Sequence, residues 1–464
     1  MRRRFLSFLL IAASLSGTVH AQNYERPKSP VPTEWPSSAN VQGRSAGSTA
    51  ASTKWQDFFT DKNLQSVIAL ALSNNRDLQV AALNIEHAQA IYRIQRAQQF
   101  PELDAAASAD IYRVPKGLST TGSAYTYRQY NVGGIVSWEL DLFGRIRSLK
   151  REALEQYFAT EQARTASQIS LVASVAETYL TLAADKDNLH LAQATYEAQL
   201  ASYNLVKQTR DAGMGSDLDL SQAQSQVEAA RVDIARYTAR VALDENALNL
   251  LVGVPVPADL LPSTLAPDGL TKELAAGLPS DVLLQRPDIL AAEHQLKAAN
   301  ANIGAARAAL FPRITLTGGG GVMSGQLSDL YAHDPATWSF APQIVMPIFD
   351  AGSRRANLKA ARVDRSVAVA QYEKTIQVGF REVSDSLVLR SRLTEEQEAQ
   401  QALVSTLEET YRLSDLRYKA GVDSYLTVLV AQRSMYAAQQ GLVNLRLARQ
   451  NNLVTLYKVL GGGG

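Results

Sequence analysis

The chain contains an internal duplication with a period of about 208 residues. Three short motifs occur once in each half, in the same order and at nearly constant spacing. They are Asn75–Leu78 with Arg286–Ile289, Arg96–Pro101 with Arg307–Pro312, and Ala212–Leu218 with Ala420–Leu426. A repeat of this length predicts one structural unit used twice. Such a repeat is more typical of a scaffold or a closed ring than of a catalytic site.

The amino terminus has the three parts of a secretory signal peptide. Arg2–Arg4 is basic, Phe5–Ser16 is apolar, and Val19–Ala21 has small residues at both ends, as a cleavage site requires. We therefore interpret residues 1–21 as a signal peptide. The apolar run is too short to cross a bilayer as a helix. The expected location is the periplasm, the outer membrane or the cell exterior.

Composition limits the remaining possibilities. The 464 residues carry a net charge of +1, which gives no case for nucleic acid as a partner. There is no cysteine, so neither a disulfide nor a lipid-modified cysteine is available. Composition and the duplication together predict five parts after the signal peptide. They are an extended arm (22–60), a first repeat (61–252), a linker (253–279), a second repeat (280–460) and a glycine tail (461–464).

Each half contains a region in which apolar and polar residues alternate. In 125–141 the apolar side chains fall on one face and the polar ones on the other, with Ile135 as the one exception. The segment 338–348 alternates in the same way. Alternation predicts strands with one apolar and one polar face. We expect strands at about 103–111, 125–141, 314–322 and 338–348, joined in pairs by loops of roughly 14 residues.

Helical periodicity dominates the rest of both halves. From Asp217 to Val252, apolar or small residues recur at steps of three and four, with Asp244 at the one missed position. This is a heptad seam, typical of coiled coils. We expect similar long helices over 145–211, 350–418 and 424–459, interrupted only near 185 and 393. Residues 61–100 are predicted to form one helix.

Four strands cannot close a barrel, and an open sheet with one apolar face exposes two unpaired edges. Three chains donating four strands each would give twelve, an even number in the range of outer-membrane barrels. Lipid would then meet the apolar face and water the polar one. The side chains expected at the lipid face or its aromatic belt are Tyr130, Val132, Val136, Trp138, Trp338 and Phe340. The alternative is a sheet packed on a soluble core.

Several segments resemble those of the TolC/OprM family of outer-membrane efflux proteins. They are Gly277–Ile289, Phe311–Pro312 before a glycine-rich strand, Arg417–Leu429 with Ala431–Arg433, and Leu456–Gly463. The resemblance covers essentially the whole mature sequence. It implies a mainly α-helical homotrimer with a small β part: a twelve-stranded transmembrane β-barrel continued by a coiled-coil α-barrel across the periplasm. It also implies two partners, a periplasmic adaptor and an inner-membrane transporter of the resistance–nodulation–division type, and no cofactor.

Two features depart from that family. OprM-like proteins commonly begin with a lipidated cysteine, which this chain does not have, so attachment would rest on the barrel alone. Similar proteins often have an aspartate where Val430 stands. A gating role for that position does not carry over to this chain.

The resemblance also indicates a gate at the periplasmic end. Asp219 and Tyr418 match an aspartate and a tyrosine of the family's aperture, and Asp423 and Asp415 are further candidates. On a threefold axis, each aspartate would become a ring of three like charges, which attracts cations. The simpler interpretation is that an aspartate after a glycine turn caps a helix, a role that a nearby serine could also fill.

Two glycine turns are expected to form the tips that an adaptor grips. Their candidate contact residues are Gly213, Gly215, Ser216, Gly421 and Ser424. The glycines would permit the reversal of the helices.

No motif supports an enzyme. Neither Glu–His pair belongs to a His-Glu-x-x-His arrangement, and Gly318–Gly321 lacks the lysine of a phosphate-binding loop. With few histidines and no cysteine, we expect no metal site. The preferred function is a passive exit duct of a tripartite efflux pump for small amphipathic compounds. The alternative is a secreted periplasmic coiled-coil adaptor or structural protein.

Overall fold

The structure, a computed structural model, describes residues 24–35, 53–120, 122–266, 280–332 and 335–462. The predicted signal peptide lies outside this range, as do the last two residues of the glycine tail. By contacts the chain forms two compact units, each taking segments from both sequence repeats. The sheet unit comprises the described residues of 24–28, 84–161 and 291–372. The helical unit comprises the described residues of 29–83, 162–290 and 373–462.

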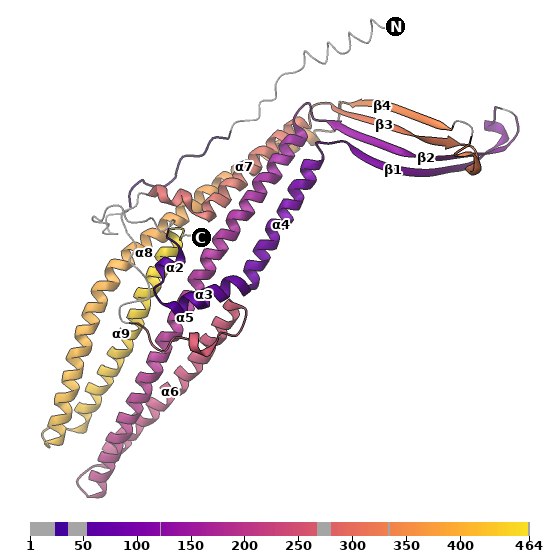
Figure 1. Ribbon diagram of the computed structural model, residues 1–464. Coiled ribbons are helices and arrows are strands. Elements are labelled where there is room, and N and C mark those ends of the chain that lie inside the picture. The colour runs from indigo at the N-terminus through magenta and orange to yellow at the C-terminus, as the bar shows by residue number, and fades with distance from the viewer. Residues whose placement is uncertain (1–23, 36–52, 121, 267–279, 333–334, 463–464) are drawn as a thin grey trace. The chain divides into compact units, whose positions relative to one another are not determined.

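The sheet unit contains one four-stranded antiparallel sheet, with its strands in chain order (Figure 1). The strands are β1 (Glu102–Val114), β2 (Tyr125–Leu140), β3 (Arg313–Ser324) and β4 (Ala336–Val345). The prediction of two strands from each half is therefore confirmed. Among the described residues, β1 and β4 each have one edge without a partner strand.

The strand register sorts the sheet into two chemically different faces. Paired residues of antiparallel strands share a face, so the odd-numbered residues of β1 lie with the even-numbered residues of β2, β3 and β4. We call this the apolar face and the opposite one the polar face. The apolar face includes Leu103, Ile111, Val132, Val136, Trp138, Leu316, Trp338, Phe340 and Ile344. The polar face includes Glu102, Asp104, Asp110, Gln129, Asn131, Thr315, Thr317 and Gln343.

Two strand boundaries differ from the prediction by three residues, and the others by one or two residues at most. β1 continues to Val114 because the ladder extends past Tyr112, whose ring stacks on that of its partner Tyr127 at 4.9 Å. β4 ends at Val345, so Met346 and Ile348 lie beyond it. Pro347 follows closely and has no N–H to donate to a ladder, which explains the early end.

Eight α-helices are described outside the sheet. They are α2 (Trp55–Phe58), α3 (Lys62–Asn74), α4 (Arg76–Ala97), α5 (Arg145–Asp211), α6 (Asp217–Val252), α7 (Pro287–Ala308), α8 (Ser353–Lys419) and α9 (Tyr425–Val459). Among the described residues, none of these helices has the length and apolar character to cross a membrane.

The expected interruptions near 185 and 393 are wrong, because α5 and α8 are continuous. The polar residues near 185 serve as docking points instead. The Lys186 ammonium donates to the Pro262 carbonyl at 3.2 Å, and Asp187 accepts from the Leu265 N–H at 3.0 Å. Charged residues in the middle of a helix thus attach a neighbouring segment and do not break the helix.

The single helix expected over 61–100 is also wrong, because Asn75 divides it into α3 and α4. The Asn75 side chain accepts from the Leu78 N–H at 2.8 Å and so caps the start of α4. It also donates to the Leu251 carbonyl at 2.8 Å. A buried asparagine that makes both bonds favours a new helix start over continuation.

The duplicated motif has the same structural task in both halves. Asn75 precedes α4 and bonds to the carbonyl of Leu251 near the end of α6. Arg286 precedes α7 and donates to the carbonyl of Val459 at the end of α9, at 2.8 Å. In each half, the residue before the helix therefore ties down the end of that half's last long helix.

The predicted arm (22–60) is not extended throughout, because it contains a short helix near its carboxyl end. Residues 55–58 form α2, and Phe58 and Phe59 are fully buried, with Phe58 stacked on Tyr457 at 4.3 Å. In the sheet unit, Tyr24 and Arg26 both hydrogen-bond to the buried carboxylate of Glu293.

The heptad seam of α6 follows the prediction closely. The helix spans Asp217–Val252, and its seam residues are buried or half-buried, among them Ala223, Val227 and Tyr237. At 1.5 Å per residue, α6 is about 54 Å long. Asp244 occupies the missed seam position, and its Oδ2 is buried with no hydrogen-bond partner among the described residues.

We expect Asp244→Asn to raise the thermal stability by a few degrees at pH 8 but not at pH 4. Burial, then the neighbouring Asp185 carboxylate, raises the pKa of Asp244 to about 6. An unfolded aspartate has a pKa of about 3.9. Between these values the folded chain keeps a proton that the unfolded chain releases, so the Asp244 contribution to stability falls as the pH rises through this window.

The measurement is the midpoint temperature of unfolding at both pH values. Asp385→Asn is the control, because that side chain is 68% exposed. A gain of equal size at pH 4 and pH 8 would show that titration of Asp244 is not the cause.

Candidate functional site

The two long helical hairpins of the helical unit end in turns of the same design (Figure 1). Gly213 and Gly421 have φ angles of 77° and 72°, in the left-handed region that side chains disfavour. After each glycine, the next N–H reaches back five residues: Met214 to the Thr209 carbonyl at 3.0 Å, and Val422 to Arg417 at 2.9 Å. This is the Schellman motif, which ends a helix and reverses the chain.

Ser216 and Asp219 form a reciprocal cap at the start of α6. The Ser216 hydroxyl accepts from the Asp219 N–H at 3.0 Å and donates to the Asp219 carboxylate at 2.9 Å. Ser216 is therefore the N-cap residue, as the simpler interpretation of this turn expected. Gly215 packs against the end of α5, where a Cβ would lie 3.0 Å from the Arg210 nitrogen. Ser424 is the N-cap residue of α9 but makes no capping bond through its side chain.

Just behind the turns, all four long helices meet in one aromatic-rich cluster, which we call the tip cluster. Its buried residues are Val206, Ala223, Tyr425, Val428 and Leu429, with Tyr203, Leu220, Tyr411 and Tyr418 packed against them. The rings of Tyr418 and Tyr425 are 5.3 Å apart, and the Tyr425 hydroxyl bonds to Ser202 at 2.9 Å. The cluster joins the hairpin of the first repeat to that of the second.

Asp219 and Tyr418, matched separately from sequence, lie within electrostatic range of each other. Burial, then the charge of Asp219, raises the pKa of the Tyr418 hydroxyl. Asp219 belongs to α6 and Tyr418 to α8, so the two residues come from different hairpins. The structure thus brings the two principal gate candidates together within one chain.

The two weaker candidates lie in local ion pairs. The Asp423 carboxylate accepts hydrogen bonds from Nε and Nη2 of Arg417, at 2.6 and 3.0 Å. This bidentate pair lowers the pKa of the Asp423 carboxyl. Asp415 pairs with Lys419 one turn along α8, at 2.7 Å. Sequence reasoning did not assign Arg417 or Arg210 a role. Arg210 pairs with Asp217 at 2.8 Å, so an arginine–aspartate pair spans each turn.

The belt candidates share the apolar face of the sheet. By register, Val132 lies beside Val322, Val136 beside Gly318 and Trp138 beside Leu316. Trp338 and Phe340 are opposite Gly320 and Gly318, and they are 81% and 63% exposed within this chain. Tyr130 lies on the same face, opposite Ala109. Ile135, the exception in the alternation, lies on the polar face between Asp104 and Gly319.

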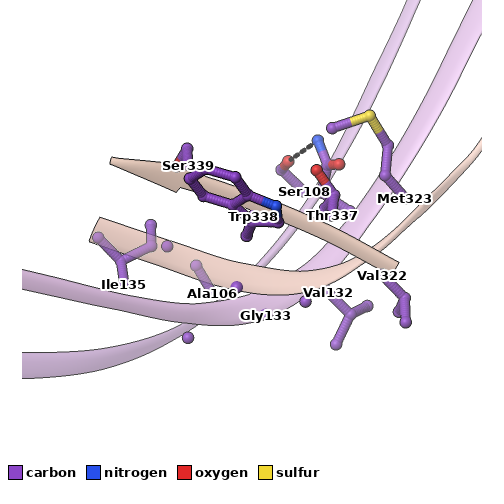
Figure 2. Close-up of a pocket in the computed structure, with 15 residues that line it drawn as sticks. Ala106, Ser108, Val132, Gly133, Ile135, Val322, Met323, Thr337, Trp338 and Ser339 are labelled. Atoms are coloured by element: carbon purple, nitrogen blue, oxygen red, sulfur yellow. Dashed lines mark hydrogen bonds between the residues drawn. The ribbon is translucent and has the colours of Figure 1, made fainter. Parts of the chain in front are cut away.

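A hollow of about 280 Å³ lies over the middle of the sheet, lined mainly by polar-face residues. Figure 2 shows Ser108 and Met323 on one side of the sheet, and Val132 and Val322 on the other. At its centre, Gly133 pairs with Gly321. A Cβ at Gly321 would lie 2.3 Å from the Val132 carbonyl oxygen, so this close approach of β2 and β3 requires glycine.

Of the four carboxylates on the polar face of the strands, three have no cation paired with them among the described residues. Glu139 is paired with Arg145 and Arg313, both at 2.8 Å. Glu102, Asp104 and Asp110 lie on the same face, and none of the ion pairs found among the described residues includes them. The described residues contain no group of three His, Asp or Glu side chains that could hold a metal ion.

These features define a class of protein: a chain with two long helical hairpins and a sheet that has one apolar and one polar face. The profile of the outer membrane efflux protein family matches residues 67–254 and 278–462. The chain is 47% identical to the toluene efflux pump outer membrane protein TtgC of Pseudomonas putida, over 100% of this chain and 96% of that protein. It is 41% identical to the outer membrane protein OprJ of Pseudomonas aeruginosa, over 99% and 95%.

Solved structures agree with the sequence relatives. The open state of the MtrE outer membrane channel of Neisseria gonorrhoeae has a TM-score of 0.85 and 38% identity, covering 95% of this chain and 97% of MtrE. A membrane protein from Pseudomonas aeruginosa has a TM-score of 0.89 and 40% identity, covering 96% and 97%. This chain belongs to the outer membrane efflux protein family. Its fold is the channel fold of that family, and its location is the outer membrane.

Proposed function

We propose that this protein is the outer-membrane exit duct of a tripartite efflux pump, assembled as a homotrimer. One observation carries the proposal: a four-stranded sheet has an apolar face, a polar face and an unpaired edge on each side. Three copies joined edge to edge would satisfy the backbone groups of all edges and give a closed barrel of twelve strands. The apolar face would then meet lipid, and the polar face would line a water-filled lumen.

In this arrangement, the lipid-facing and belt residues are Tyr130, Val132, Val136, Trp138, Trp338 and Phe340. The unpaired carboxylates of the polar face would give the lumen a preference for cations. TtgC is named for the efflux of toluene. We assign small amphipathic compounds as the cargo and, by analogy with TtgC, small apolar ones, with passive diffusion as the transport step.

The tip cluster is the proposed periplasmic gate. Asp219 and Tyr418 come from different hairpins of one protomer and would lie near the threefold axis, so that their electrostatic coupling would favour the closed position of the helices. Asp423 and Asp415 would act through their ion pairs with Arg417 and Lys419. A periplasmic adaptor would contact the turns at Gly213, Gly215, Ser216, Gly421 and Ser424. An inner-membrane transporter, of the resistance–nodulation–division type, would supply the energy.

Complementation tests this function. A bacterium lacking its own exit duct should regain low accumulation of a fluorescent amphipathic dye when it expresses this chain together with a cognate adaptor and transporter. The control is the same three-component set with Val132→Asp and Val136→Asp, which put charges on the apolar face. Unchanged dye accumulation with the wild-type chain present in the outer membrane would overturn the proposed function.

A further inference from the structure

The apolar face carries only two charged residues among those of the four strands, and both are arginines. They are Arg113 on β1 and Arg128 on β2. The face has no aspartate or glutamate in these strands. Every carboxylate of the sheet lies on the opposite face. Two cations on a surface that otherwise suits hydrocarbon are costly unless they reach the interface or pair with an anion, and the strands of this face supply no anion.

The register brings these arginines close together. Arg113 is opposite Thr126, and Arg128 is opposite Ile111. They are therefore diagonal neighbours on adjacent strands, about 7–8 Å apart at their backbones, within reach of one shared anion. Both side chains are exposed, and no ion pair with the described residues involves either of them.

Their level on the strand corresponds to one boundary of the apolar band. Ten residues of β2 separate Arg128 from Trp138, a length of about 33 Å along the strand. A tilt of about 40° reduces this to a height of about 25 Å, which is the height of the apolar band in outer-membrane barrels. Tyr130 and its partner Ala109 lie just inside that boundary, and Ile111 lies beside Arg128. If Trp138 marks one interface, the arginines mark the other.

We propose that Arg113 and Arg128 form a binding site for the phosphate groups of lipid headgroups in the outer leaflet. This inference rests on the proposed function, which puts the strand ends near the helices on the periplasmic side and the β1–β2 turn on the outside. Two guanidinium groups can each donate paired hydrogen bonds to phosphate oxygens, a geometry that lysine does not offer. The site would fix the depth of the barrel and hold a shell of phosphorylated lipid around it.

The test is native mass spectrometry of the detergent-purified, delipidated protein with two probes. One probe is bisphosphorylated lipid A, and the other is the same lipid after removal of both phosphates. Wild type should bind the phosphorylated lipid about 30-fold more tightly than the variant R113Q/R128Q does, from the loss of two cations near the lipid surface. The dephosphorylated lipid should bind wild type and variant equally weakly. Inorganic phosphate at the same concentration should not compete.

The variant R113K/R128K keeps both charges and should bind with intermediate affinity. If R113Q/R128Q does not fold, the binding of the two lipids to wild type tests the inference by itself. Equal affinity of wild type for the phosphorylated and the dephosphorylated lipid would overturn it. Equal binding by wild type and R113Q/R128Q would also overturn it. A stable detergent-dependent trimer without phosphate preference would reject only this site. The absence of any such trimer would reject the proposed function as well.

Discussion

The double variant Asp219→Asn with Tyr418→Phe is expected to raise the single-channel conductance of the isolated protein several-fold. The two changes remove the charge of Asp219 and the hydroxyl of Tyr418, on which that charge acts, and keep the shapes of both side chains. The tip cluster should therefore keep its packing and lose the electrostatic coupling between α6 and α8. If the closed state is favoured by a few kcal/mol or less, such a loss shifts the population toward the open state.

The measurement is conductance in planar bilayers. Asp217→Asn is the matched control. Asp217 lies in the same helical turn as Asp219, and its side chain is 83% exposed. Its ion pair is with Arg210 of the same hairpin, so the substitution leaves the other hairpin unaffected. The control should conduct as wild type does. Equal conductance of the double variant and wild type would show that this contact does not hold the gate.

Arg286→Ala is expected to destabilise the helical unit by about 2–3 kcal/mol. The Arg286 side chain is 9% exposed and pairs with Asp288 at 2.7 Å and Glu382 at 3.0 Å. It also donates to the Val459 carbonyl at the end of α9. Removing one partner of a buried ion pair costs about 3–5 kcal/mol. Both carboxylates are about one-third exposed, so water offsets part of this loss.

Thermal unfolding followed by the helical circular dichroism signal measures this effect. Arg381→Ala is the control, because Arg381 is 70% exposed and its pair with Asp385 is 3.9 Å long. Arg286→Lys should fall between the two, since lysine keeps the charge but cannot bridge both carboxylates and the carbonyl. Equal midpoints for Arg286→Ala and Arg381→Ala would contradict the role assigned to this residue.

Periodicity was sufficient to predict the long elements of the fold. The bounds of α6 follow from its heptad seam, because a helix of 36 residues leaves a repeated signal at every turn. The two faces of the sheet follow equally well from alternation. The strand pairing also places Trp338 and Phe340 on the face of Val136, which the separate strand patterns could not establish.

The missed features depend on single side chains and long-range partners. Asn75 lies within a helical pattern, and only its bond to the Leu251 carbonyl shows why the chain starts a new helix there. The polar run near Asp187 looked like a break, but its partners are in the segment around Leu265, 78 residues away. Neither contact leaves a periodic signal in the sequence.

The candidate gate was only partly accessible from sequence. The resemblance identified Asp219 and Tyr418 one by one, and the helical packing brings them together. Arg417 was part of a matched motif, yet its bidentate pair with Asp423 depends on the turn geometry at Gly421. An arginine six residues before an aspartate has no fixed relation to it until a left-handed glycine reverses the chain between them.

The most direct test of the central claim is the mass of the mature protein extracted from outer-membrane fractions in mild detergent. A detergent-dependent species with three times the protomer mass is the predicted result, because one chain supplies four strands and closure requires twelve. A water-soluble monomer or dimer in the periplasm would contradict the shared barrel. It would favour the coiled-coil adaptor in its place.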